Sequence, residues 1–331
     1  MAKVLVTGGA GFIGSHLAQE LIAMDYTVVI LDDLSGGFRE NIPEGAEFVE
    51  GSILDQDLLA TLFKHNKFSY VFHLAAYAAE GLSHFIKRFN YANNLIGSVN
   101  LINLSVLHRV QCFVFTSSIA VYGKNQVPMS EKVVPRPEDS YGIAKLAVED
   151  ELRISLEMFG LPYIIFRPHN VYGERQNIGD KYRNVVGIFM NQIMQGLPMT
   201  IFGEGKQTRA FSHIADIVPA MAKSIRIPEA YNEIFNIGSD KPYSLNQLAA
   251  AVADAFEVEL NVQYLDPRNE VLEAYSDHSK AERILKVSSG ISLEKGLRRF
   301  AAWAREQGPR SSKDFTDIDI EIPINLPPSW R

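Results

Sequence analysis

Short apolar runs alternate with segments of helical periodicity along the first half of the chain. The run at 4–7 ends in glycines and predicts a buried strand, 12–24 carries apolar residues at helical spacing, and 27–32 is a second apolar run. A strand, a helix and a strand within about thirty residues predict a right-handed βαβ unit. The alternation continues, with strands expected at 46–50, 70–75, 112–117 and 162–167 and helices at 55–65, 89–108 and 141–159. This pattern predicts an α/β protein with a Rossmann-like, doubly wound parallel sheet covered by helices on both faces.

The pattern changes after Pro168. Residues 172–184 are rich in Gly, Asn, Gln and charge and predict a loop. Ser244-Leu245-Asn246-Gln247 has the residue types of a capping box and predicts a helix to about residue 256. Beyond the loop we also expect helices at 185–195 and 214–225 and strands at 199–202, 233–237 and 260–265.

These segments predict two lobes. The main lobe, with the sheet, is expected from residues 1–170 and 216–256, and a smaller mixed α/β lobe from residues 171–215 and 257–331. The tail from Pro309 is polar and then rich in proline. The pattern does not decide whether this tail is disordered or wraps the body.

The composition is that of an ordinary globular protein, with 331 residues, 47% apolar and 21% charged. A single cysteine, Cys112, excludes a disulfide within the chain, argues against a cysteine-built zinc site and fits a reducing cytoplasm. We expect no metal site. The net charge of -7 argues against a general nucleic-acid binder. No apolar run reaches the roughly 18 residues of a membrane span. The N-terminal apolar run stops at Gly8-Gly9, where a signal peptide would continue.

Glycines at positions 8, 11 and 14 lie between the first predicted strand and the first predicted helix. They let the backbone turn tightly and approach a pyrophosphate, and the free N–H groups at the helix start then face the phosphates. Asp32 ends the second strand, 18 residues after Gly14. This context favours a dinucleotide-binding loop made by Gly8, Gly11 and Gly14 over a purely structural turn.

Asp32 also indicates which dinucleotide binds. Its carboxylate would accept ribose hydroxyls and repel a 2′-phosphate, so we expect NAD rather than NADP. Arg39 is the best argument for NADP, but a solvated loop arginine is the simpler interpretation. Asp33 is either a second adenosine contact or a cap.

Tyr141 and Lys145 stand four residues apart on a predicted helix and therefore share one face. Tyrosine is a poor base at neutral pH, but an adjacent ammonium favours its phenolate. The pair thus suits a general base that takes a hydroxyl proton while hydride leaves the same carbon. Such a pair is also common on surface helices. It gains weight from Thr116-Ser117-Ser118, which end a strand where open α/β sheets bind ligands.

Together these residues resemble the extended short-chain dehydrogenase/reductase superfamily, and within it the UDP-glucose 4-epimerase branch. The resemblance covers nearly the whole chain. Its further motifs are His73-Leu74-Ala75-Ala76, Asn94, 117–123, 167–173, 209–216 and 277–281.

The resemblance implies roles for named residues. Tyr141 would be the base, Lys145 its partner and a contact of the nicotinamide ribose, and Ser118 the serine that relays the proton. NAD would be held by Tyr141, Lys145 and the glycine loop. It would also contact Phe12, Ile13, Asp32, Asp33, Leu34, Ser35, Gly36, Ser52, Ile53, Leu74, Ala75, Ala76, Asn94, Thr116 and Pro168. A UDP-sugar would be bound by Ser118, Tyr141, Asn170, Val186, Thr200, Phe202, Arg209, Arg268 and Glu270.

Within the substrate set, the two arginines would clamp the diphosphate, because fork-shaped donors suit phosphates. Glu270 would meet the ribose, and Thr200 and Phe202 would lie against the uracil. Without the resemblance, Phe202 is interpreted as a core residue and Arg268 as a surface arginine.

Two positions bear on the reaction. Relatives that eliminate water or decarboxylate carry acidic residues just before the tyrosine of the Val-Tyr-Gly motif, whereas this chain has Ile119 and Ala120. Neither can move a proton. The resemblance therefore implies inversion at C4 through a transient 4-keto sugar, with few charges near the sugar.

The sugar itself stays open. Ala274 is small where members restricted to plain hexoses tend to be bulky, which hints at room for an N-acetyl group. UDP-glucose and UDP-galactose, their N-acetylated pair and UDP-glucuronate are the candidates. The last would use positive charges that are otherwise ordinary solvated residues: His84, Lys87, Arg88, Arg175, Lys181 and Arg183.

Two other functional classes share many of these motifs. A nucleotide-sugar oxidoreductase with net NADH release would carry all of them, whereas a non-catalytic NAD sensor need not keep Tyr141, Lys145 and Ser118 together. The family usually forms homodimers through the helices near 90–108 and 141–159. Apolar stripes on these helices are otherwise interpreted as core.

Overall fold

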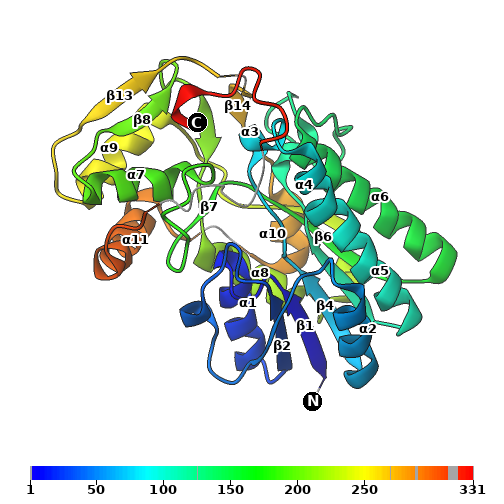
Figure 1. Cartoon of the computed structure of the whole chain (residues 1–331). Helices are drawn as coiled ribbons and strands as arrows, with labels where there is room; N and C mark the ends of the chain where they lie inside the picture. The colour runs from blue at the N-terminus through cyan, green and yellow to red at the C-terminus, as the bar shows by residue number, and fades with distance from the viewer. Residues whose placement is uncertain (1, 125, 269, 288–289, 312–319, 331) are drawn as a thin grey trace.

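The main sheet has seven parallel strands. The computed structural model describes residues 2–124, 126–268, 270–287, 290–311 and 320–330. The strand order is β11-β6-β5-β4-β1-β2-β3, so the direction of winding reverses between β1 and β4 (Figure 1). This confirms the predicted doubly wound α/β fold. The strands are β1 Lys3–Thr7, β2 Thr27–Asp32, β3 Glu47–Glu50, β4 Phe68–His73, β5 Cys112–Thr116, β6 Tyr163–Pro168 and β11 Glu233–Ile237.

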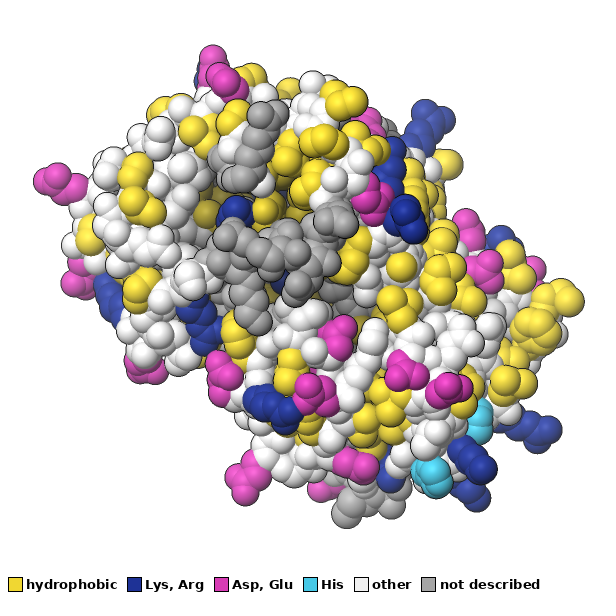
Figure 2. All heavy atoms as spheres, in the orientation of Figure 1, with side chains coloured by type: hydrophobic (Ala, Val, Ile, Leu, Met, Phe, Trp, Pro, Cys, Tyr) yellow, Lys and Arg dark blue, Asp and Glu magenta, His cyan; other side chains and the backbone are white. Residues whose placement is uncertain are grey.

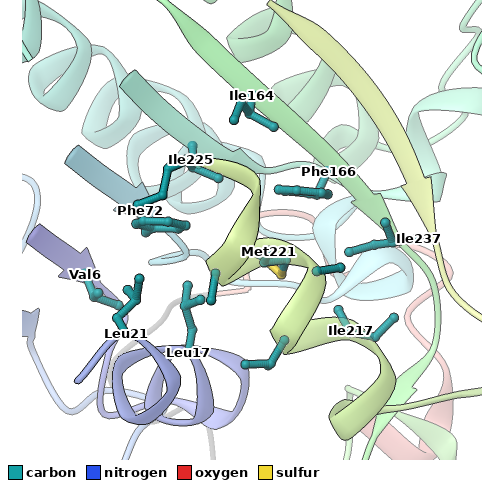
Figure 3. Close-up of a cluster of buried hydrophobic side chains, with 14 of the residues drawn as sticks. Val6, Leu17, Leu21, Phe72, Ile164, Phe166, Ile217, Met221, Ile225 and Ile237 are labelled. Atoms are coloured by element: carbon teal, nitrogen blue, oxygen red, sulfur yellow. The ribbon is translucent and has the colours of Figure 1, made fainter. Parts of the chain in front are cut away.

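Helices cover both faces of this sheet. Successive residues of β1 point to opposite sides, so that Val4 and Val6 join one apolar core and Leu5 the other. On the first side, α1 (Phe12–Ala23) and α8 (Ile214–Ser224) pack on the strands. Figure 3 shows apolar side chains of both helices meeting those of β1, β4, β6 and β11. The second side is covered by α2 (Gln56–His65), α5 (Gly97–Leu107) and α6 (Ser140–Phe159).

The helix predicted over 89–108 is confirmed as an unbroken helical run over 87–107, and its middle turn is π-helical. The structure has α4 (Lys87–Tyr91), a π-helical turn over Ala92–Ile96 and then α5. In the wide turn the Asn94 amide accepts a hydrogen bond from the Tyr77 N–H at 2.8 Å and donates one to the Tyr77 carbonyl at 3.0 Å. The π turn therefore ties this helix to the loop that follows β4, at a place where apolar periodicity gives no signal.

The second lobe is built around its own apolar core. The predicted capping box is confirmed, since the Ser244 hydroxyl and the Gln247 amide each bond the other's backbone at the start of α9. Small sheets pair β8 with β13, β7 with β10, and β9 with β12 and β14. The remaining helices and strands of the whole chain have these bounds: α3 Glu80–Ser83, β7 Val171–Tyr172, α7 Val185–Met194, β8 Met199–Phe202, β9 Thr208–Ala210, β10 Ser212–His213, β12 Pro242–Ser244, α9 Leu245–Ala255, β13 Val262–Leu265, β14 Glu273–Ala274, α10 Ser279–Leu285 and α11 Leu293–Gln307.

Two helices pack differently from the predicted division into lobes. Helix α9 was expected with the main sheet, but its Leu248 and Val252 are buried in the second core. Helix α10 was expected in the smaller lobe, but its Ala281 and Leu285 pack in the first core. We therefore propose that 214–238 and 279–287 belong with the main lobe and that 239–255 belongs with the smaller lobe. The prediction assigned consecutive segments of the chain to the same lobe. In the structure, the chain crosses between the two lobes more often than this assumption allows.

Acidic and basic side chains are interspersed on the face shown in Figure 2. Among the described residues, no helix has the length and apolarity needed to cross a membrane.

Candidate active site

The glycine loop is shaped by close backbone contacts. Gly8 has a φ of 71°, and a Cβ added there would lie 2.7 Å from the Ala75 nitrogen. A Cβ on Gly14 would lie 2.1 Å from the Gly8 carbonyl oxygen. Gly11 stands at the N-cap of α1, where no side chain caps the helix. The loop thus brings the start of α1 to the end of β1 and leaves an uncapped helix start, which suits a pyrophosphate.

Asp32 is buried at the end of β2 beside this loop. Its carboxylate accepts hydrogen bonds from the Ala10 N–H at 3.0 Å and the Leu34 N–H at 2.8 Å. Burial raises the pKa of Asp32 above its ordinary value. Arg39 pairs with Glu50 and is stacked over Phe48 at 5.2 Å. Its engagement there removes the main argument for NADP.

The rest of the expected NAD set lies around the carboxyl ends of the strands. The Asp33 carboxylate accepts from the Ser35 N–H at 3.0 Å, which is the capping interpretation. Ser52 accepts the Leu54 N–H at 3.2 Å. Half-buried residues include Phe12, Ile13, Leu34, Gly36, Leu74, Ala75 and Ala76, whereas Ile53, Asn94, Thr116 and Pro168 are buried.

One unpaired group supports the fit of a cofactor. The Thr116 hydroxyl, at the end of β5, is buried without a hydrogen-bond partner among the described residues. A buried hydroxyl of this kind costs stability unless a partner arrives. With the uncapped helix start and Asp32, the residues present fit NAD.

Tyr141, Ser118 and Lys145 come together at the start of α6. Asp139 caps this helix by accepting the Gly142 N–H at 2.7 Å, which fixes the first turn and Tyr141 within it. The Ser118 side chain lies near the Tyr141 hydroxyl and lowers the pKa of Tyr141, against the larger effect of burial, which raises it. One turn on, Lys145 is buried and its Nζ donates to the Thr116 carbonyl at 2.9 Å and lies 5.7 Å from the centre of the Tyr141 ring.

The protonation of this trio differs from the expectation. We predicted that the Lys145 ammonium lowers the pKa of Tyr141, but burial, followed by the charge of Glu80, raises it, while the Ser118 side chain lowers it. Burial also lowers the pKa of Lys145 to about 7, although the charge of Glu149 acts against this. A desolvated lysine carries less charge near neutral pH and so has less influence on its neighbour.

A buried ion pair supports the same helix from behind. The Arg167 guanidinium on β6 forms two bonds to the Glu149 carboxylate, one of them from Nε at 2.9 Å, and donates to the Tyr122 hydroxyl at 2.7 Å. The Ser117 hydroxyl donates to Glu149 at 2.5 Å. Ser117 is therefore held in the ion-pair network, which leaves Ser118 as the serine beside Tyr141.

A cavity of about 400 Å³ extends from this trio between the lobes. Ile119, Ala120 and Asp139, neighbours in sequence of Ser118 and Tyr141, line one end, while Ser118 and Tyr141 are themselves buried and do not line it. Six of the residues expected to bind the substrate do line the cavity: Asn170, Thr200, Phe202, Arg209, Arg268 and Glu270.

Val186 does not fit its expected role. It is fully buried in the second core, and its neighbour Val185 lines the cavity instead. Both residues lie in the first turn of α7, where adjacent positions face different directions, so a one-residue difference in alignment moves the side chain from the cavity to the core.

Three charged side chains cluster in the cavity wall. Glu270 lies 3.4 Å from Arg209 and 3.5 Å from Arg268. Arg209 is anchored further by donating to the Thr208 carbonyl at 2.8 Å. The Arg268 guanidinium lies 4.6 Å from the centre of the Phe202 ring. This arrangement presents two guanidinium groups to a ligand. In the absence of a ligand, the Glu270 carboxylate partly neutralises their positive charge.

Sequence reasoning missed many residues of the cavity wall, and three of them matter for the chemistry: Glu80, Asp139 and Trp330. Glu80 is exposed to the cavity, where desolvation by the surrounding walls, then the charge of Asp139, raises its pKa to about 7, and burial raises the pKa of Asp139 to about 6. Two carboxyl groups that the sequence analysis did not expect therefore line the cavity. Asp139 could have been found from the sequence, because an aspartate just before Ser140 and Tyr141 is typical of a helix N-cap. No local sequence pattern indicates that Glu80 or Trp330 lies at the cavity.

Comparison with known proteins agrees with this site. Residues 4–238 match the model of the NAD dependent epimerase/dehydratase family. This chain belongs to that family. A putative UDP-glucose 4-epimerase of Methanocaldococcus jannaschii is 34% identical over 305 residues, covering 91% of this chain and 98% of the relative.

Two solved structures show how far the likeness extends in space. The UDP-glucose 4-epimerase of Thermotoga maritima with UDP-glucose has a TM-score of 0.88 at 35% identity, covering 92% of this chain and 99% of the other. The UDP-glucuronic acid 4-epimerase of Bacillus cereus, with UDP-glucuronic acid and NAD, has a TM-score of 0.85 at 28% identity, with coverage of 92% and 99%. The family membership confirms the predicted resemblance and makes this chain an NAD-dependent enzyme.

Proposed function

We propose that this enzyme inverts C4 of a UDP-hexose, either UDP-glucose and UDP-galactose or their N-acetylated pair, through a transient 4-keto sugar. The observation that carries the proposal is the placement of Tyr141, Ser118 and Lys145 next to a cavity that Arg209 and Arg268 also line. The similar proteins above are named for 4-epimerisation of UDP-sugars.

The proposed division of labour follows from the chemistry of each residue. Tyr141 takes the proton of the sugar 4-hydroxyl, and Ser118 orients that hydroxyl and passes the proton. NAD, when bound, supplies reversible hydride transfer at C4. Gly8, Gly11, Gly14 and Asp32 would hold it, with Thr116 and Lys145 near its reacting end.

Binding energy is concentrated on the part of the substrate that does not react. Arg209 and Arg268 would hold the diphosphate and Phe202 the uracil, while Ala274 leaves the sugar end of the cavity open. A firmly held nucleotide with a loosely held sugar lets the 4-keto sugar turn over and present its other face.

A neutral hexose fits the cavity better than a hexuronate. Glu80 and Asp139 line the cavity and would repel a sugar carboxylate whenever they are ionised. Of the positive groups, Arg183 is paired with Asp180 at 2.6 Å and lies over the Tyr77 ring at 4.8 Å. One positive charge that would favour UDP-glucuronate is thus offset by Asp180, while His84 and Lys181 also line the cavity.

The test is direct. Purified protein is incubated separately with UDP-glucose, UDP-GlcNAc and UDP-glucuronate, without added NAD, and the sugars are analysed, with Tyr141→Phe as the inactive control. We expect C4 inversion of one of the first two substrates and its loss in Tyr141→Phe. Inversion of UDP-glucuronate alone would replace the hexose in the proposal. Accumulation of NADH without inversion would identify an oxidoreductase instead.

A further inference from the structure

The C-terminal residues 320–330, called the C-terminal strap below, are bound to the main lobe. The Glu321 carboxylate accepts the N–H of Arg88 at 2.9 Å and of Phe89 at 3.2 Å, at the start of α4. The Glu321 N–H in turn donates to the Phe85 carbonyl at 2.8 Å. Leu326 is buried in a small apolar cluster with Leu82 of α3. Figure 1 shows this segment in red beside α3 and β14.

The strap ends by placing Trp330 in the wall of the cavity. This side chain is only 7% exposed. Its ring centre lies 5.5 Å from that of Tyr182 and 6.5 Å from that of Phe202, both edge to face. A Cβ added to Gly81 would lie 2.9 Å from the Trp330 ring, so α3 carries glycine where the indole approaches. Trp330 thus bridges from α3 in one wall to β8 in the other.

Arg268 as a result lies beside two aromatic rings that contact each other. Its guanidinium is 4.6 Å from the Phe202 ring centre and 5.8 Å from that of Trp330. A guanidinium over aromatic faces is attracted to them and loses freedom to turn. Glu270 fixes a third side at 3.5 Å. The arginine is therefore oriented toward the cavity by groups that include the last described residue of the chain.

The geometry points to Trp330 as a positioning residue of the nucleotide-sugar site, through which the C-terminal strap takes part in binding a nucleoside diphosphate. It acts by forming the cavity wall opposite Phe202 and by holding Arg268 in the orientation that meets the diphosphate. This inference rests on the proposed function, because the ligand class comes from the UDP-sugar proposal. Trp330 acts on the diphosphate through Arg268 and not on the reacting carbon. Its loss should therefore weaken substrate binding and leave the chemical step intact.

The binding of UDP alone tests this assignment. The chain has two tryptophans, and Trp303 packs against the second core and not on the cavity. In Trp303→Phe the intrinsic fluorescence comes from Trp330, and we expect UDP to change it. Trp330→Ala should bind UDP about ten-fold more weakly, the order expected from loss of a partly desolvated cation–π contact. Trp330→Phe should recover part of the affinity.

Turnover separates positioning from a purely structural role. With the sugar that the enzyme inverts, Trp330→Ala should raise KM with kcat little changed, and its NAD content should equal that of the wild type. Equal UDP affinity in wild type and Trp330→Ala, or Trp330 fluorescence that UDP leaves unchanged, would overturn the inference and leave the proposed function standing. A wild type that neither binds UDP nor converts any UDP-sugar would overturn both.

Discussion

Single carboxyl and hydroxyl groups set the chemistry at the sugar end of the cavity. Glu80 lines the cavity wall, and its negative charge raises the pKa of Tyr141. The Ser118 side chain acts in the opposite direction. The proton affinity of the proposed base thus depends on a residue that stands 61 positions earlier in the chain.

Replacing Glu80 by glutamine should make Tyr141 a base at lower pH. Glu80 itself has a pKa of about 7, so below that pH it is already neutral and Glu80→Gln should behave like the wild type. Above it, the variant lacks the charge that raises the Tyr141 pKa, and the rising limb of kcat/KM should shift to lower pH. The pH profile measures this, with Glu151→Gln on the exposed face of α6 as control. A limb that stays in place would contradict the coupling.

A second substitution tests the glycine loop. In Gly14→Ala the added methyl group would lie 2.1 Å from the Gly8 carbonyl oxygen, so the loop must shift. We expect most of the NAD to be lost from the purified protein, measured after denaturation. Gly160→Asn is the control, because nothing lies within 4 Å of a Cβ there and asparagine tolerates the left-handed backbone. Equal NAD content in both variants would show that the loop does not set cofactor binding.

At the level of elements, α6 and β6 are joined by the buried pair of Glu149 and Arg167. The pair also bonds Ser117 and Tyr122, and the charge of Glu149 acts on the pKa of Lys145 one turn away. Removing one member leaves the other charge buried and unpaired. That is more costly than the pair is worth.

Glu149→Gln should therefore lower the free energy of unfolding by about 3–5 kcal/mol, the loss typical of an uncompensated buried charge. Glu157→Gln breaks the exposed pair with Arg153 on the same helix and should cost at most about 0.5 kcal/mol. Urea unfolding compares the two variants. Similar small losses would mean that Arg167 finds water or another partner when Glu149 is neutral.

The sequence predicts these elements well where the pattern is local. The alternation of apolar runs places every strand of the main sheet, and the serine and glutamine of the capping box place the start of α9. The π turn at Asn94 is missed because its side-chain bonds go to Tyr77, outside the helix. Glu80 and Trp330 are missed because each faces the cavity through contacts that are distant in sequence.

On the scale of the whole molecule, α5 and α6 lie side by side (Figure 1). Apolar side chains on both helices are exposed. Of the stripes seen in the sequence, Ile102 is buried as core, whereas Ile154 and Met158 are 41% and 67% exposed. Leu107 at the end of α5 is 74% exposed. Apolar side chains gathered on two adjacent helices are typical of an interface, and a homodimer through these helices remains our prediction.

Charges placed on this surface should separate the subunits. We expect the wild type to sediment as a dimer and Ile154→Glu/Met158→Glu to sediment as a monomer, because burying two carboxylates in an apolar interface without partners is unfavourable. Leu260→Glu is the matched control, since Leu260 is 55% exposed but lies just before β13 in the smaller lobe. It should leave the dimer intact. The cavity described above is formed within a single chain, so we expect the monomeric variant to keep its affinity for UDP. A double variant that still sediments as a dimer would move the interface to another surface.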